Sequence, residues 1–150
     1  MKNIFAGSFK NATNLVHVKK ELIFILESLA KLPKTTRIGY VSGIVSSDGD
    51  HKLAENIQIL LVHTEKLRNL LDFPVFSTAD VITKELYDRF DETKLEREKR
   101  EKCFRSFWCE VIEQGGVTDI FMTPRWELSN GATAEHQTTR ELGLKIHYVK

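Results

Sequence analysis

The stretch "VTDIFMTPRWELSNGATAEHQTTRELGLKIHYV", Val117 to Val149, reads as strand, loop, helix and strand. Its first part, "VTDIFMTP", has almost no polar interruption, as expected for a strand covered on both faces. A loop of Ser, Asn and Gly leads into a helical segment, and "LKIHYV" follows as another strand. A helix that joins two strands favours parallel pairing through a right-handed crossover. The stretch therefore predicts an α/β layer fold.

The preceding sequence alternates in the same way. Three earlier segments are strand-like: "NIFAGSF" (3–9), "RIGYVSGIV" (37–45) and "FPVFS" (73–77). Helical spacing of apolar residues covers 14–32, 54–71 and 91–114, with a shorter helical patch at 79–90. Asn14 is the expected N-cap of the first helix. With the two strands of the closing stretch, we expect a mostly parallel sheet of five strands.

Size and composition indicate one ordinary globular domain over residues 1–150, because no linker or internal repeat divides the chain. Lys and Arg (22) nearly balance Asp and Glu (21), so no global field favours a nucleic-acid polymer as partner. No apolar run is long enough to span a bilayer, and "MKNIFAGSFKNATN" lacks the apolar core of a signal peptide. We therefore expect a cytoplasmic protein without a membrane partner.

The cysteines and histidines give no sign of a metal or cofactor. Cys103 and Cys109 are six residues apart in a predicted helix and are expected to be buried free thiols. The five histidines form no H-x-x-x-H or Cys/His cluster. The run "DETKLEREKREK" (91–102) mixes charges at helical spacing, which predicts a solvated helix face.

The segment "YVSGIVSSDGDH" (40–51) joins a predicted strand to a predicted helix. Parallel α/β sheets bind their ligands in the loops at the carboxyl ends of the strands, so this loop is a candidate binding site. Gly43 would let the backbone approach a ligand. The serines of the same loop could bind sugar or phosphate oxygens: Ser42, Ser46 and Ser47. The alternative is a loop of turn-forming residues in which Asp48 or Asp50 begins the next helix. The loop lacks the G-x-G-x-x-G pattern of dinucleotide sites.

"PRWELSNGATAE" (124–135) is a more specific signal. Ser129, Asn130 and Gly131 precede a helix, so free N–H groups and the positive end of its dipole favour an anion such as phosphate. Glu135, one turn into that helix, would reach the same pocket. The alternative is a solvated or salt-bridged surface glutamate. The apolar residues of this helix are only Ala132, Ala134 and Leu142. A surface helix normally buries a stripe of larger apolar side chains, so contact of the first turn with a ligand is indicated instead.

The segment "TPRWELSNGATAEHQTTRELGLKI" resembles the nucleoside 2-deoxyribosyltransferase family, whose small relatives end in a W-E-x-S-x-G-A-x-x-E-H-x-x-A-x-x-L-G pattern. Thr139 stands where that pattern usually has a small residue, often alanine. "YVSG" (40–43) resembles the family's first strand and loop. The resemblance runs from about Arg37 to the C-terminus, so residues 1–36 would be an added N-terminal strand and helix. The positions that fit the C-terminal pattern are Trp126, Glu127, Ser129, Gly131, Ala132, Glu135, His136, Leu142 and Gly143.

The resemblance implies a Rossmann-like three-layer α/β/α sandwich, assembled as a homodimer or larger oligomer, that acts on the N-glycosidic bond of a nucleoside or nucleotide. Glu135 matches the family's nucleophile. Ser129, six residues earlier, matches the phosphate-binding serine of the branch that hydrolyses deoxynucleoside 5′-monophosphates. The expected pocket consists of Tyr40, Ser42, Gly43, Asp48, Trp126, Ser129, Asn130 and Gly131 around Glu135.

The chain departs from the family at one catalytic position. The family usually has an aspartate in the helix before the "VTDIFMTP" strand, a place that falls around 107–110 here. Trp108 falls there, with Glu110 or Asp48 as possible substitutes for the acid. Hydrolysis and transfer to another base both stay open. The alternative is a protein without catalytic activity that retains the fold and serves in nucleotide sensing or in oligomeric interactions.

Overall fold

The structure, a computed structural model, describes residues 5, 8–9, 12, 14–47, 49–82 and 97–150. Within these ranges the sheet has four strands, all parallel, in the order β2-β1-β3-β4. They are β1 (Gly39–Ser42), β2 (Val75–Ser77), β3 (Asp119–Met122) and β4 (Lys145–Tyr148). The α/β class and the parallel sheet are confirmed, and the architecture is compatible with a Rossmann-like fold.

The fifth strand, expected at residues 3–9, is not found among the residues that the structure describes. Phe5, Ser8 and Phe9 lie in turns, and the N–H of Ser8 donates to the carbonyl of Phe5 at 3.0 Å. Phe5 and Phe9 are buried, and the Phe5 ring centroid lies 5.4 Å from that of Phe76. These β-prone aromatic residues therefore add to the core instead of to the sheet.

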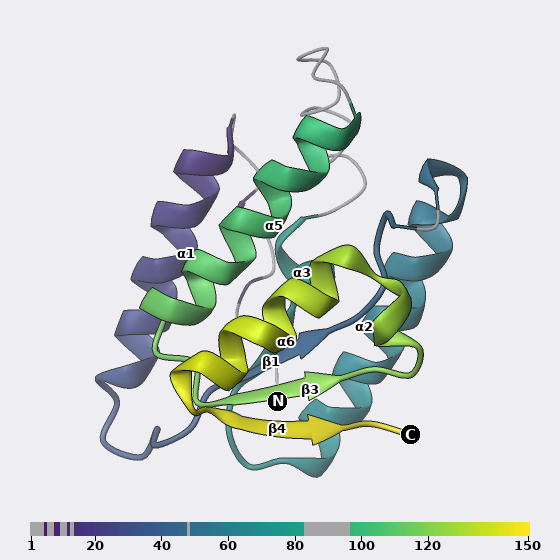
Figure 1. The fold of residues 1–150 in the computed structure, drawn as a ribbon. Coiled ribbons are helices and arrows are strands. Elements are labelled where there is room, and N and C mark those ends of the chain that lie inside the picture. Colours follow the sequence, from purple (N-terminus) through teal and green to yellow (C-terminus); the bar gives the residue numbers. More distant parts are fainter. Residues whose placement is uncertain (1–4, 6–7, 10–11, 13, 48, 83–96) are drawn as a thin grey trace.

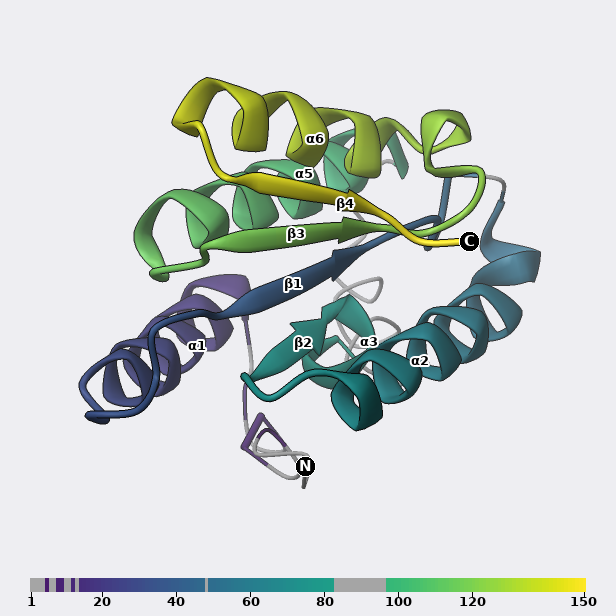
Figure 2. The same ribbon diagram turned by 90° about the horizontal axis from the view of Figure 1, so that it is seen from below.

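The sheet lies between two layers of helices (Figures 1 and 2). On one face, α1 (Leu15–Ala30), α5 (Arg97–Gln114) and α6 (Asn130–Leu142) share a core with Tyr40 and Ile120. On the other face, α2 (Leu53–Leu70) packs against a second core. The second core contains Val41, Leu60, Phe73, Val75 and Phe121. Because successive side chains of a strand point to opposite faces, Tyr40 and Val41 belong to different cores.

Local sequence signals set the ends of α1 and α6. Asn14 caps α1 as predicted, since its side chain accepts the N–H of His17 at 2.8 Å. The Ser129 hydroxyl likewise accepts the N–H of Ala132 at 3.1 Å and caps α6. Gly143, at φ +69°, ends α6 in the left-handed conformation that glycine adopts readily. The sequence thus fixes where the helix that carries Glu135 begins.

Two predicted helices lie partly outside the described residues. The patch expected at 79–90 corresponds to the short helix α3 (Thr78–Val81), and residues 83–90 are not described. The helix expected at 91–114 corresponds to α5, which is described from Arg97. Cys103 is exposed and Cys109 is half-buried, both as free thiols. The expected burial of Cys103 is therefore wrong, because only the second half of α5 packs tightly onto the sheet.

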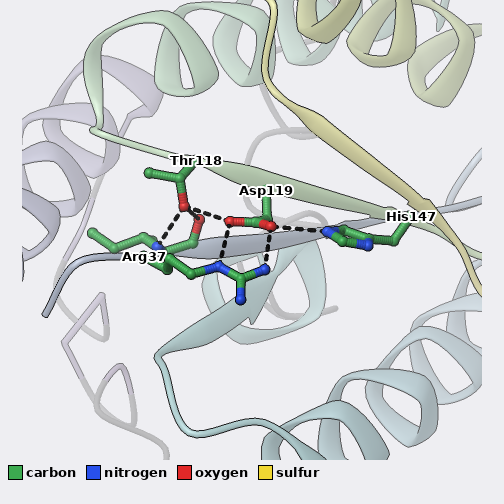
Figure 3. Close-up of polar contacts among 5 residues, drawn as sticks. Arg37, Thr118, Asp119 and His147 are labelled. Atoms are coloured by element: carbon green, nitrogen blue, oxygen red, sulfur yellow. Dashed lines mark hydrogen bonds and ion pairs between the residues drawn. The ribbon is translucent and has the colours of Figure 1, made fainter.

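Hydrogen bonds and ion pairs connect the amino ends of the strands through a polar cluster, here called the Asp119 cluster, of Arg37, Thr118, Asp119 and His147 (Figure 3). Arg37 donates two hydrogen bonds to the Asp119 carboxylate, at 2.6 and 3.2 Å. Thr118 donates a third at 2.6 Å, and His147 Nε2 lies 2.8 Å from Oδ1. The cluster connects the segment before β1 to β3 and β4. It stabilises the end of the sheet opposite the carboxyl ends.

No helix within the described ranges is both long and apolar enough to cross a bilayer. The same residues hold no group of three or more His, Cys, Asp or Glu side chains suited to a metal ion.

Candidate functional site

A pocket, here called the site pocket, lies at the carboxyl ends of the strands. Four segments line it: the loop after β1, the residues after β2, one face of α5 and the first turns of α6. This is where a parallel α/β sheet normally binds its ligand, because the loops that follow the strands meet there. Among the residues that the structure describes, the pocket contains two carboxylates, those of Glu101 and Glu135, and one guanidinium, that of Arg105.

Glu135 is buried in the wall of the site pocket, with 4% of its surface exposed. Tyr40 donates a hydrogen bond to Oε1 at 2.5 Å, and Ser42 donates one to Oε2 at 3.0 Å. Tyr40 and Ser42 are alternate residues of β1, so both side chains point to the face of the sheet that α6 covers. Both carboxyl oxygens of Glu135 are thus held by the same strand. The alternative of a solvated surface glutamate is wrong.

Burial raises the pKa of Glu135, and the hydrogen bonds from Tyr40 and Ser42 lower it. Burial has the larger effect, so the pKa rises from 4.5 to about 7. No ion pair to Glu135 is formed by the described residues. Near neutral pH this carboxyl group exchanges between its charged and neutral forms, a property common among groups that take part in catalysis.

The Tyr40 side chain is itself fixed on several sides. Its hydroxyl lies 3.0 Å from the Thr78 hydroxyl, and its ring stacks on Trp108 with a centroid distance of 5.1 Å. Because the single Tyr40 proton goes to Glu135, Thr78 is the donor to Tyr40. Burial and the neighbouring charge of Glu135 raise the pKa of Tyr40 well above its ordinary value. Tyr40 therefore stays protonated and remains a donor.

The first turn of α6 forms another wall of the site pocket. Ser129 is buried, and its hydroxyl lies 3.4 Å from that of Ser47, which also accepts the N–H of Asn130 at 3.2 Å. A Cβ added at Gly131 would meet no atom nearer than the Ser129 hydroxyl oxygen, at 3.8 Å. Arg105 lines the same pocket from α5. The positive end of α6 and the Arg105 guanidinium together favour an anionic group here.

Gly43 lines the site pocket, but a side chain at this position is excluded by a neighbouring loop of the protein and not by a ligand. A Cβ at Gly43 would lie 2.2 Å from the Thr123 hydroxyl oxygen, far inside any normal contact. The tight approach is between the loops that follow β1 and β3. Gly43 thus allows the two loops that form the pocket edge to pack together.

The structure brings together seven of the predicted site residues: Tyr40, Ser42, Gly43, Ser129, Asn130, Gly131 and Glu135. Trp126 is not among them. Its ring stacks on His136 with centroids 4.3 Å apart, next to Tyr148, away from the residues that line the pocket. The left-handed backbone at Arg125, with φ +67°, begins the turn that positions Trp126 there. Asp48 lies outside the described residues.

Of the pocket face of α5, only Trp108 is expected from the sequence, because it falls at the place of the family's acid. Glu101, Phe104, Arg105 and Trp108 share this face, at the spacing i, i+3, i+4 and i+7. The charge pattern of residues 91–102 predicts a solvated helix face, yet one carboxyl oxygen of Glu101 is buried and its side chain lines the site pocket. The same helical spacing, applied backwards from Trp108, would have identified it.

Glu110, considered as a substitute acid, lies on a different side of α5. Its carboxylate forms an ion pair with Lys19 of α1. Two residues beyond Trp108 correspond to more than half a turn of helix, so the two side chains point in different directions. Glu110 is thus not a member of the site pocket.

Comparison of the chain with protein-family models, curated proteins and solved structures finds no match. The resemblance to nucleoside 2-deoxyribosyltransferases stays a prediction from the residues of the C-terminal stretch.

Proposed function

We propose that the site pocket binds a nucleoside 5′-monophosphate and cleaves or transfers its N-glycosidic bond, with Glu135 as the nucleophile. The observation that carries this proposal is a buried carboxylate in the pocket wall whose two oxygens are held by Tyr40 and Ser42. The resemblance of "WELSNGATAEH" to the family's C-terminal pattern supports it, because Glu135 is the residue that matches the nucleophile. A Rossmann-like nucleoside 2-deoxyribosyltransferase-like domain and a homo-oligomer belong to the same proposal.

The chemistry of such a bond suits this carboxylate. Cleavage of C1′–N passes through an oxocarbenium-like state, which a negative oxygen beside C1′ stabilises and can trap as an ester. Tyr40 and Ser42 fix the direction from which that oxygen approaches. A carboxylate with a pKa of about 7 is more basic than an exposed one and is therefore a better nucleophile once ionised. Water or a second base then resolves the ester, which gives hydrolysis or transfer.

The phosphate belongs at the start of α6. The hydroxyls of Ser47 and Ser129 and the Arg105 guanidinium border this end of the pocket. Binding a 5′-phosphate there would orient C1′ towards Glu135, about one and a half turns further along the helix. The energy of phosphate binding would thus assist the reaction at a distant atom of the same molecule.

The test compares the wild-type protein with Glu135→Gln, and with Glu141→Gln as the matched control on the exposed side of α6. Each protein is incubated with deoxynucleoside 5′-monophosphates and with the free nucleosides, and chromatography measures the released base. We expect release by the wild type and the control, faster from the monophosphates, and none by Glu135→Gln. Equal release by all three proteins would show that Glu135 is not the nucleophile. Nucleotide binding in a thermal-shift assay without any release would instead favour a sensing protein.

A further inference from the structure

A second carboxylate, Glu101, lines the same pocket as Glu135 and has no part in the function proposed above. It lies on α5, two turns before Trp108, whose ring stacks on Tyr40. Phe104 and Trp108 form an apolar wall along the same face of α5. The pocket therefore has one carboxylate near the sheet, an apolar wall suited to a flat base, and a second carboxylate towards the start of α5.

Breaking an N-glycosidic bond normally requires such a second group. A purine or pyrimidine leaves poorly as an anion, so a donor has to protonate it as the C1′–N bond breaks. Glu135 cannot serve, because as the nucleophile it attacks C1′ in its ionised form. A proton donor on another wall of the pocket is needed.

The other polar side chains at the pocket fit this role less well. Tyr40 already donates its proton to Glu135, and its pKa lies well above the ordinary value. The Arg105 guanidinium is assigned to the anionic group of the ligand. Glu110 faces Lys19 outside the pocket. Glu101 is the carboxyl group that remains among the pocket residues that the structure describes.

We infer that Glu101 is the general acid of the reaction proposed for this pocket, and the inference rests on that proposed function. As the C1′–N bond breaks, its electron pair goes to the base nitrogen, which takes the proton of the Glu101 carboxyl group. Glu135 forms the new bond to C1′. Water then attacks C1′ and gives its proton to the Glu101 carboxylate, while Glu135 leaves as a carboxylate. The net reaction converts nucleotide and water into free base and sugar phosphate, with both side chains restored.

The experiment follows base release in a single turnover, with protein in excess over substrate, so that only cleavage of the C1′–N bond is measured. It compares two substrates that differ in their need for a proton. Deoxyadenosine 5′-monophosphate requires protonation of its base, whereas 7-methyl-2′-deoxyguanosine 5′-monophosphate carries a positive base that leaves without it. We expect Glu101→Gln to slow release of adenine by about 100-fold or more, the usual contribution of a general acid. Release of 7-methylguanine should change by less than about threefold, because no proton transfer is lost. Glu113→Gln, an exposed glutamate of the same helix, should act on both substrates like the wild type.

Three results would overturn the assignment, and they are distinguishable. Equal slowing of both substrates by Glu101→Gln would mean that Glu101 binds or supports the pocket and is not the acid. Unchanged release of adenine would mean that it has no role in the reaction. Release of neither base by the wild-type protein would overturn the proposed function of the pocket together with the role of Glu101.

Discussion

Two buried carboxylates lie at opposite ends of the same sheet, and their surroundings differ in one respect. Asp119, at the amino end, accepts hydrogen bonds from the Arg37 guanidinium as well as from Thr118. Glu135, at the carboxyl end, accepts only from the hydroxyls of Tyr40 and Ser42 among the described side chains. A cation therefore offsets the cost of burying the charge at one end, and none of the described residues forms an ion pair that offsets it at the other.

The pKa values follow this difference. Burial on its own would raise the pKa of Asp119, but the bonds from Arg37, Thr118 and His147 outweigh it and hold the pKa well below its usual range. The pKa of Glu135 is raised to about 7. A carboxylate that is ionised at every physiological pH is suited to a structural role. One that is poised between its two forms is suited to chemistry.

The largest effect expected from this contrast is in the pH dependence of stability. The folded pKa of Glu135 lies above its unfolded value, so the folded state binds more protons between pH 4.5 and 7 and becomes less stable as the pH rises through that window. The loss is on the order of 3 kcal/mol for a shift of this size. Urea unfolding at pH 5 and pH 8 measures it. Glu135→Gln should remove this loss, and a variant with the full wild-type dependence would contradict the assignment.

Asp119→Asn should lower the stability at neutral pH, because it removes a buried carboxylate whose charge is offset by the Arg37 guanidinium. We expect a loss of about 2 kcal/mol of unfolding free energy at pH 7, because the charged hydrogen bonds from Arg37 disappear. In the wild type this contribution is present above the unfolded pKa of an aspartate, about 4, and is lost as the pH falls towards the folded pKa. Glu113→Gln, at an exposed carboxylate of α5, is the control in the same urea titration. Equal stability of the two variants would mean that the Asp119 cluster adds nothing.

Ser42→Ala should produce the smallest of the three changes, and the affected quantity is the pKa of Glu135. Ser42 lowers the pKa of Glu135, so its removal should raise that pKa by about one unit. Carbon-detected NMR titration of the glutamate carboxyl groups measures the change. Ser46→Ala, in the same loop, should leave the titration of Glu135 unchanged. A pKa that stays the same in Ser42→Ala would mean that the Ser42 hydrogen bond is absent in solution.

The features that could be predicted from sequence are those encoded by neighbouring residues. Caps such as Asn14 and Ser129 identify helix starts because each accepts the N–H of the residue three positions later. Glu135 could then be located one turn into α6, near the carboxyl ends of the strands. The parallel sheet followed from the alternation of strand and helix patterns. These signals depend on short separations along the chain.

The features that could not be predicted depend on distant contacts. The Asp119 cluster joins Arg37 to a residue 82 positions away, and no local pattern indicates that pair. Glu101 has the sequence context of a solvated helix, and only the packing of α5 beside α6 turns its side chain to the pocket. The strand expected at 3–9 is not found among the described residues, where Phe5 and Phe9 are buried in turns, because the same aromatic residues that favour strands also favour burial.

The most direct test of Glu135 as a nucleophile is the pH dependence of base release from a deoxynucleoside 5′-monophosphate. Because only the ionised carboxylate can attack C1′, the acidic limb of the kcat/KM profile should rise with pH with an apparent pKa near 7. The midpoint should move upward in Ser42→Ala, which separates the ionisation of Glu135 from that of the substrate phosphate. A midpoint near 4.5, or one that does not move in Ser42→Ala, would contradict the account.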